Sequence, residues 1–177
     1  MATRYVALLR AINVGKRRME MAKLRAELEA IGLDDVSTFI GSGNALFTSG
    51  RKPATLEPQI ERCIEAGFGY LAEAFVRSAD QIAEIVERRP FGVVPDGDTH
   101  LVAFLRSAPS AGDRTAIEAL SGERDQLIVR DAEVHWHIAG KTMDSLLKPK
   151  DWKAAGAGLN TTRNITMLTK LAAKLHG

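Results

Sequence analysis

The sequence contains a single cysteine, Cys63, in 177 residues. One cysteine excludes an internal disulfide and any metal cluster that needs several cysteine ligands. Cys63 falls at helical spacing with Leu56, Ile60 and Ile64. We therefore interpret it as a small buried hydrophobic residue rather than as a reactive thiol.

Long hydrophobic runs are also missing. No stretch approaches the roughly 20 apolar residues that a membrane-spanning helix needs. The N-terminal segment passes from the apolar residues 5–9 straight into a polar loop, without the basic region and long apolar core of a signal peptide. We expect a cytoplasmic protein that does not bind membranes.

The chain carries little net charge, +2, but the charge is unevenly placed. Residues 1–20 hold five basic side chains and one acidic one, and residues 141–177 hold seven basic and two acidic ones. If the two ends meet in space, they form a positive surface. The alternative is a set of basic side chains scattered over the solvated exterior. The 45% of hydrophobic residues is ordinary for a folded protein.

The first half of the chain alternates strand and helix patterns. Residues 5–9 are apolar without alternation, which is typical of a central strand covered on both faces. The other predicted elements are a helix at 21–31, a hairpin at 36–48, a helix from Pro53 to near Gly67 and a strand at 70–76. Strand, helix, strand, strand, helix, strand is the βαββαβ order of a ferredoxin-like unit. Ser78 and Gln81 then predict a capping box for another helix.

The second half repeats this order in part. The Pro- and Gly-rich segment 89–98 is the best candidate for a boundary, so we assign subdomains to residues 1–89 and 90–177. Strands are predicted at 100–105, 126–129 and 134–138, with a helix around Ile117, a helical segment near 143–147 and a final helix at 162–175. The last strand of the first half has no predicted counterpart. The fold class is therefore α+β, with two packed small subdomains and a C-terminal helix.

The most site-like residues follow the first strand and form the hairpin turn. The loop carries Arg10, Asn13, Gly15 and Lys16, and the turn carries Ser42, Gly43 and Asn44. We expect the loop and the turn to lie side by side. Backbone N–H groups together with Arg and Lys can hold an anion, although the spacing is neither a phosphate loop nor a dinucleotide fingerprint. The alternative is that both segments serve only as structural turns.

A third candidate segment precedes the last predicted helix. Thr162, Arg163 and Asn164 stand where a helix begins. Thr or Asn at this place is an ordinary N-cap. A helix N-terminus with an arginine and several lysines nearby is also a site for an anion.

The sequence gives little support for a metal site, a catalytic site or a cofactor. His135 and His137 point the same way on a strand, but no third ligand is indicated, so we expect no metal. Ser42 has no histidine base, and no carboxylate pair stands out for catalysis. The sequence indicates no cofactor. The glutamates of the predicted helices are most simply solvated: Glu27, Glu29, Glu57, Glu61 and Glu65.

Four blocks of this sequence resemble the bacterial family called domain of unknown function 1697. The blocks are R-Y-V-A-L-L-R-A-I-N-V-G-K, M-A-K-L-R-A-E-L-E-A-I-G, V-S-T-F-I-G-S-G-N-A-L-F and T-T-R-N-I-T-M-L-T-K-L. The resemblance implies two small α+β subdomains of ferredoxin-like character and no established activity. The positions that match the family pattern are Arg10, Asn13, Gly15, Ser42, Gly43, Asn44, Thr162, Arg163 and Asn164. Departures stand at Ala11, Lys16, Gly41 and Ile165.

These observations lead to one main functional hypothesis and two alternatives. The main one is binding of a phosphate-bearing ligand, a nucleotide or nucleic acid, by the loop, the turn and the segment 162–164. The first alternative is a small enzyme acting on an anionic metabolite, with Arg10, Lys16 and Arg163 stabilising charge. The second is a protein-interaction module that uses an exposed sheet edge. The sequence leaves enzymatic activity and the oligomeric state open.

Overall fold

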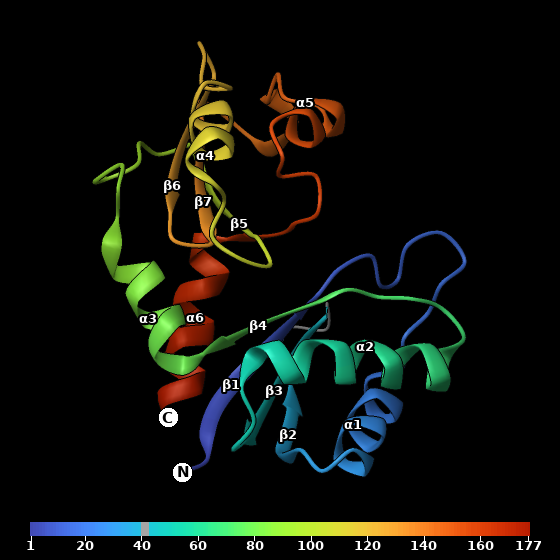
Figure 1. Ribbon diagram of the computed structural model, residues 1–177. Helices are drawn as coiled ribbons and strands as arrows, with labels where there is room; N and C mark the ends of the chain where they lie inside the picture. The colour runs from blue at the N-terminus through green and yellow to red at the C-terminus, as the bar shows by residue number, and fades with distance from the viewer. Residues whose placement is uncertain (40–42) are drawn as a thin grey trace. The chain divides into compact units, whose positions relative to one another are not determined.

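The computed structural model describes residues 1–39 and 43–177 (Figure 1). By internal packing the chain divides into two compact units. The first unit comprises Met1–Glu84 with Lys170–Gly177, and the second comprises Ile85–Thr169. The division falls inside helices α3 (Ala79–Arg88) and α6 (Ile165–His176), whereas the sequence favoured a boundary at residues 89–90.

The first unit has the predicted βαββαβ order. Its elements are β1 (Thr3–Leu9), α1 (Met21–Ala30), β2 (Asp34–Thr38), β3 (Asn44–Ser49), α2 (Pro53–Phe68) and β4 (Ala74–Ser78). The four strands form an antiparallel sheet in the order β2-β3-β1-β4. In this register Val6 of β1 lies between Leu46 of β3 and Arg77 of β4. The central place of β1 explains its unbroken apolar run, because both of its faces are buried.

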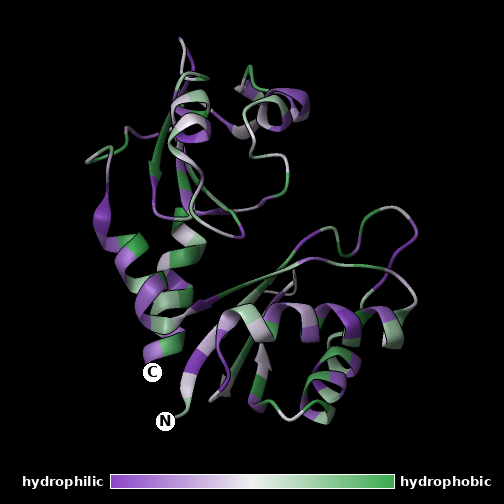
Figure 2. Ribbon diagram, viewed as in Figure 1, coloured by the Kyte–Doolittle hydropathy of each residue, from purple (hydrophilic) through white to green (hydrophobic). Residues whose placement is uncertain are grey.

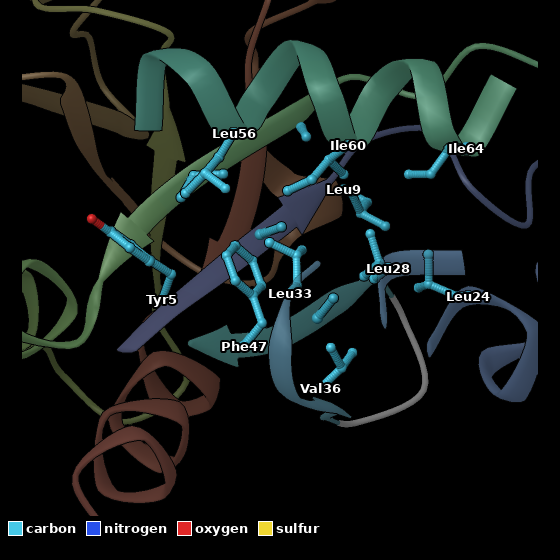
Figure 3. Close-up of a cluster of buried hydrophobic side chains, with 14 of the residues drawn as sticks. Tyr5, Leu9, Leu24, Leu28, Leu33, Val36, Phe47, Leu56, Ile60 and Ile64 are labelled. Carbon is cyan, nitrogen blue, oxygen red and sulfur yellow. The ribbon is translucent and has the colours of Figure 1, made fainter. Parts of the chain in front are cut away.

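The core of the first unit lies between this sheet and helices α1 and α2 (Figure 3). Figure 2 shows hydrophobic and hydrophilic residues in turn along α2, as expected for a helix with one buried face. The side chains that meet in the core come from both layers: Tyr5, Ala7 and Leu9 of β1, Phe47 of β3, Leu24 and Leu28 of α1, and Leu56, Ile60 and Ile64 of α2. Cys63 is buried beside them, as predicted, and its Sγ donates to the Glu27 carbonyl at 3.3 Å.

Two glutamates of α2 depart from the prediction of solvated side chains. Glu57 Oε1 accepts a hydrogen bond from Val76 N, and Glu61 Oε1 accepts one from Ala74 N, each at 2.9 Å. Both N–H groups belong to β4, which is an edge strand of the sheet. The carboxylates thus occupy backbone donors that an incoming strand would need.

Substituting Glu57 by Ala is expected to lower the free energy of unfolding by about 2 kcal/mol. The Val76 N–H is buried, and a buried donor without a partner costs about 1–3 kcal/mol. Urea unfolding followed by circular dichroism measures the change. Glu65→Ala, an exposed glutamate of the same helix, is the matched control and should alter stability by less than about 0.5 kcal/mol. Equal effects of the two substitutions would contradict a capping role for Glu57.

The second unit repeats the whole order of the first. Its elements are β5 (Thr99–Phe104), α4 (Ala111–Glu118), β6 (Asp125–Arg130), β7 (Glu133–Ile138), the 3-10 turn η1 (Thr142–Asp144), α5 (Pro149–Ala154) and β8 (Thr161–Asn164). The sheet order β6-β7-β5-β8 matches that of the first sheet, strand for strand. The expectation that the last strand is missing was wrong. β8 has four polar residues and runs directly into α6. Neither an apolar pattern nor a turn in the sequence therefore indicates a strand at this place.

The repeat extends to one pair of side chains. Val6 of β1 pairs with Arg77 of β4, and Val102 of β5 pairs with Arg163 of β8. In both arginines Nη1 donates to the carbonyl of the preceding residue at 3.0 Å. The two halves therefore carry an arginine at equivalent positions of their last strands, an equivalence that the predicted order of elements did not indicate.

Helices α3 and α6 each contribute to both units. The predicted capping box of α3 is confirmed, because Ser78 N donates to Gln81 Oε1 at 2.9 Å and Gln81 N donates to Ser78 Oγ at 3.2 Å. At the start of α6, Asn164 Oδ1 accepts a hydrogen bond from Thr166 N at 2.8 Å. In residues 1–39 and 43–177, no helix has both the length and the apolar character needed to cross a membrane.

Candidate functional site

The loop after β1 lies against the described end of the hairpin turn. Leu9 N donates to the Gly43 carbonyl at 2.7 Å. Gly43 has a φ of +80°, and a Cβ there would stand 2.8 Å from Ile12 Cδ1 and 3.2 Å from the Leu9 carbonyl oxygen. Only glycine fits such a position. Ser42, another residue of the predicted site, lies outside the described residues.

Three of the predicted ligand-binding side chains make contacts within the protein. Arg10 Nη1 lies 3.5 Å from Glu73 Oε1. Asn13 Oδ1 accepts from Met19 N at 2.8 Å. Asn44 is buried, and its Nδ2 donates to the Phe39 carbonyl at 3.1 Å. These contacts shape the loop and the hairpin, so they support the structural alternative at these three positions.

The far part of the same loop is more exposed and more basic. Gly15, at a φ of +61°, turns the chain, and Lys16, Arg17 and Arg18 follow with exposed side chains. In Figure 1 the loop bulges out near the C-terminal end of α2. The three basic side chains line an open hollow together with Val14, Phe68 and Tyr70. The sequence-based site stopped at Lys16 and missed Arg17 and Arg18, although the basic run was visible there.

Two aromatic rings form the other side of this hollow. Phe68 ends α2, and Tyr70 follows the left-handed Gly69, with the ring centroids 6.3 Å apart. The Arg17 guanidinium carbon lies 5.1 Å from the Tyr70 ring centroid, and Lys23 Nζ lies 4.9 Å from that of Phe68. Each ring therefore carries a cation on its face.

The hydroxyl of Tyr70 has an unusual environment. It is buried and has no hydrogen-bond partner among the residues that the structure describes. Burial raises the pKa of Tyr70, and the charge of Arg17 opposes this shift. The hydroxyl stays protonated at neutral pH and remains able to donate a hydrogen bond.

The segment 162–164 lies in the second unit and belongs to strand β8, and only its last residue, Asn164, also acts at the start of α6. Thr162 pairs with Ala103 and Arg163 with Val102 of β5. Arg163 Nη1 also donates to Thr161 Oγ1 at 2.8 Å. Burial lowers the pKa of Arg163 to about 10, so the side chain remains a cation at neutral pH. That this segment shares one surface with the loop of the first unit stays a prediction.

Three histidines share the face of the second sheet that is turned away from α4. His100 Nε2 and His135 Nδ1 are 3.0 Å apart, and His137 Nε2 lies 2.8 Å from Asp98 Oδ2. The Phe91 ring packs on both His100 and His137. The sequence indicated His135 and His137 but missed His100. Its neighbourhood follows from the pairing of β5 with β7, which places His100 opposite His137.

The buried imidazoles are held neutral. Burial, together with the nearby His137, lowers the pKa of His100 to about 4. Burial also lowers the pKa of His135 to about 4, with smaller contributions from His100, Arg88 and Arg130. Across residues 1–39 and 43–177, no three or more His, Cys, Asp or Glu side chains are grouped as metal ligands. The pair of His100 and His135 is therefore a buried, uncharged polar contact at neutral pH.

Comparison with known proteins places the chain in a family. No curated protein matches it. A solved structure described as "The structure of conserved bacterial protein SP0830 from Streptococcus pneumoniae" resembles it with a TM-score of 0.78, at 24% sequence identity over 99% of both chains. This likeness shows that the two chains share a fold. The model of the family "Protein of unknown function (DUF1697)" matches residues 2–135. The chain thus belongs to the DUF1697 family, in agreement with the resemblance of its sequence blocks.

Proposed function

We propose that this protein binds a phosphate-bearing ligand through the basic end of the loop after β1. The observation that carries the proposal is the hollow lined by Lys16, Arg17 and Arg18 beside the Tyr70 ring. Residues 14–18 contain three cationic side chains and no acidic one. Exposed guanidinium and ammonium groups bind phosphate oxygens by charge-assisted hydrogen bonds.

The contacts of the other predicted residues reduce the set of side chains that we assign to ligand binding. Arg10 faces Glu73, and Asn13 and Asn44 bind backbone groups, so we assign them to the support of the loop. Gly15 supplies the turn that presents Lys16. Ser42 and the segment with Thr162 and Arg163 are not needed for this version of the site.

Phosphate-bearing ligands are expected to raise the melting temperature of the protein at low salt. A ligand that binds only the folded state stabilises it by mass action. The panel consists of inorganic triphosphate, a nucleoside triphosphate and a single-stranded oligonucleotide, measured by differential scanning fluorimetry. The combined variant Lys16→Ala, Arg17→Ala, Arg18→Ala should lose the shift that the wild type shows.

The control for this experiment changes the same amount of charge elsewhere in the first unit. The combined variant Arg25→Ala, Lys52→Ala, Arg62→Ala removes three exposed basic side chains outside the loop. It should keep most of the wild-type shift, apart from a small loss through long-range electrostatics. A wild type that responds to no member of the panel, or two variants that respond equally, would overturn the proposal.

A second candidate, a small enzyme acting on an anionic metabolite, is favoured by one pair of side chains. Asp98 Oδ2 holds His137 Nε2 at 2.8 Å, and Asp98 Oδ1 is fixed by Gly140 N at 3.0 Å. A carboxylate that fixes one ring nitrogen orients the other one as a general base. Loss of a phosphate-ester hydrolysis in His137→Gln would support this candidate, and an unchanged rate would remove His137 from it.

The alternative function, an interaction module that binds a partner strand at a sheet edge, has less structural support. At the β4 edge, Glu57 and Glu61 occupy backbone donors. At the β6 edge, Glu118 Oε1 accepts from Val129 N at 3.0 Å and Ser121 Oγ accepts from Leu127 N at 2.9 Å. A partner strand would have to displace these side chains, which favours the basic loop over these two edges as the binding surface.

We also propose a fold description for the first unit and a cellular location for the protein. The order β2-β3-β1-β4, with helices on one face, supports a ferredoxin-like description of the first unit. A single buried cysteine suits a reducing compartment, and we keep the cytoplasm as the proposed location.

A further inference from the structure

We infer that the ligand of the basic loop is a single-stranded nucleic acid rather than a free nucleotide. This inference rests on the proposed function and narrows it to one class of ligand. It is drawn from the shape of the hollow, the two cation-bearing rings and the turn that brings these rings together. These features are separate from the charge that supports phosphate binding in general.

The first argument is the shape of the hollow. A small-molecule site is a concave pocket that encloses most of its ligand. The hollow beside Lys16, Arg17 and Arg18 is shallow and open to solvent. An open surface leaves most of a mononucleotide exposed, but it lets a longer strand enter and leave at its sides.

The second argument is the pairing of rings and cations. Proteins that bind single strands combine a positive track for phosphates with aromatic or guanidinium planes on which bases stack. Phe68 and Tyr70 are neighbours, with centroids 6.3 Å apart and planes tilted by 54°. Arg17 lies over Tyr70 and Lys23 over Phe68. The Arg17 guanidinium over Tyr70 is itself a plane on which a base can stack, and Lys23 over Phe68 adds a second cation beside it.

The third argument concerns the position of these groups in the chain. The left-handed residue Gly69, with a φ of +76°, ends α2 and brings Tyr70 back beside Phe68. A Cβ at Gly69 would meet no atom within 4 Å, so the left-handed φ of this helix cap is what favours glycine here. The Tyr70 hydroxyl is buried, so this residue supports the surface through its ring and the Arg17 guanidinium that lies over it.

Fluorescence anisotropy with the full-length protein tests the inference. The probes are labelled single-stranded RNA and DNA of about 12 nucleotides, the matching duplex, and a labelled mononucleotide. We expect at least one single strand to bind about tenfold or more tightly than both the duplex and the mononucleotide. Its affinity should fall steeply as the salt concentration rises, because bound lysine and arginine displace counterions from phosphates.

Ring variants separate stacking from charge. Tyr70→Leu removes the ring that supports the Arg17 guanidinium plane without changing charge, and its affinity for the single strand should fall about tenfold, as for loss of one stacked base. Tyr70→Phe keeps the ring and should retain most of the affinity. Melting temperatures of both variants are compared with the wild type, so that a folding defect in Tyr70→Leu is recognised. In that case Phe68→Leu takes its place.

The outcomes distinguish the inference from the function on which it rests. If the mononucleotide or the duplex binds as tightly as the single strand, the inference falls while phosphate binding stands. If Tyr70→Leu, or Phe68→Leu in its place, keeps the wild-type affinity, the proposed stacking surface is wrong. If no probe binds and the phosphate panel gives no thermal shift, both the inference and the proposed function fall.

Discussion

Acidification from pH 6.5 to pH 4 is expected to destabilise the second unit by on the order of 3 kcal/mol or more. The cause is the buried pair His100 and His135, whose facing ring nitrogens are 3.0 Å apart. Burial lowers the pKa of each imidazole from 6.5 to about 4. Well above pH 6.5 both rings are neutral in the folded and the unfolded chain, so their titration does not change the stability there.

The sign follows from proton binding. Between pH 6.5 and 4 the unfolded chain binds protons on these imidazoles and the folded unit does not, so stability falls as the pH falls. Below pH 4 the folded pair also titrates and the effect levels off. Arg88 of α3, Arg130 of β6 and His137 of β7 face the pair and oppose its protonation. Acidic groups stand next to two of these, since Asp98 is bound to His137 and Asp131 to Arg88.

Tryptophan fluorescence measures this effect, because both tryptophans of the chain, Trp136 and Trp152, pack in the core of the second unit. Urea unfolding is followed at pH 7 and pH 4.5. A double variant, His100→Phe with His135→Leu, removes both imidazoles and should flatten the pH profile, whatever its stability at pH 7. His176→Gln, a histidine of the first unit, is the control and should keep the fall. A wild-type profile as flat as that of the double variant would refute the assignment.

Asp125→Ala is expected to destabilise the second unit by about 3 kcal/mol or more. Asp125 is 2% exposed, and its carboxylate accepts hydrogen bonds from Trp136 Nε1 at 2.8 Å, Ser145 Oγ at 2.6 Å and Leu146 N at 2.9 Å. Alanine leaves three donors without an acceptor, one of them in a buried and two in part-buried hydrogen bonds, and an unpaired buried donor costs about 1–3 kcal/mol. The same contacts hold the segment after β7 against the sheet.

Denaturant unfolding followed by circular dichroism tests this prediction, since Trp136 itself loses a partner. Asp131→Asn is the matched control. Asp131 is exposed and pairs with Arg88 at 2.7 Å, and a surface ion pair contributes only about 0–1 kcal/mol. Asn also tolerates the φ of +53° at this position. If Asp125→Ala costs no more than Asp131→Asn, the carboxylate does not organise this part of the fold.

The order of elements in the first unit was open to prediction from the sequence. The unbroken apolar run of β1 and the helical spacing of Leu56, Ile60 and Ile64 are local patterns, and burial of these faces dominates folding. The capping box of Ser78 and Gln81 was also predictable, because it is a local pattern whose two hydrogen bonds join residues three apart.

The candidate site also combines residues that a local sequence pattern indicates with residues that only the fold brings to it. The basic run at Lys16, Arg17 and Arg18 is visible in the sequence, but its partner Tyr70 is more than fifty residues away. The approach depends on how β4 returns along β1, where Arg10 N meets the Glu73 carbonyl at 2.9 Å. The pattern of polar residues therefore indicated the loop. It did not indicate which of the loop's side chains make hydrogen bonds or ion pairs within the protein.

What the sequence by itself determined is the set of amphipathic elements, since the period of apolar residues depends only on local geometry. The tertiary structure decided the remainder. Strand β8 exists because β5 offers backbone partners to four polar residues, and hydrogen bonding of a backbone requires no apolar pattern. His100 meets His135, and Glu57 meets Val76, only after strands and helices distant in the chain have paired. Such contacts obey no fixed spacing in the sequence, because the register of the sheet and the packing of helix on sheet set their distances.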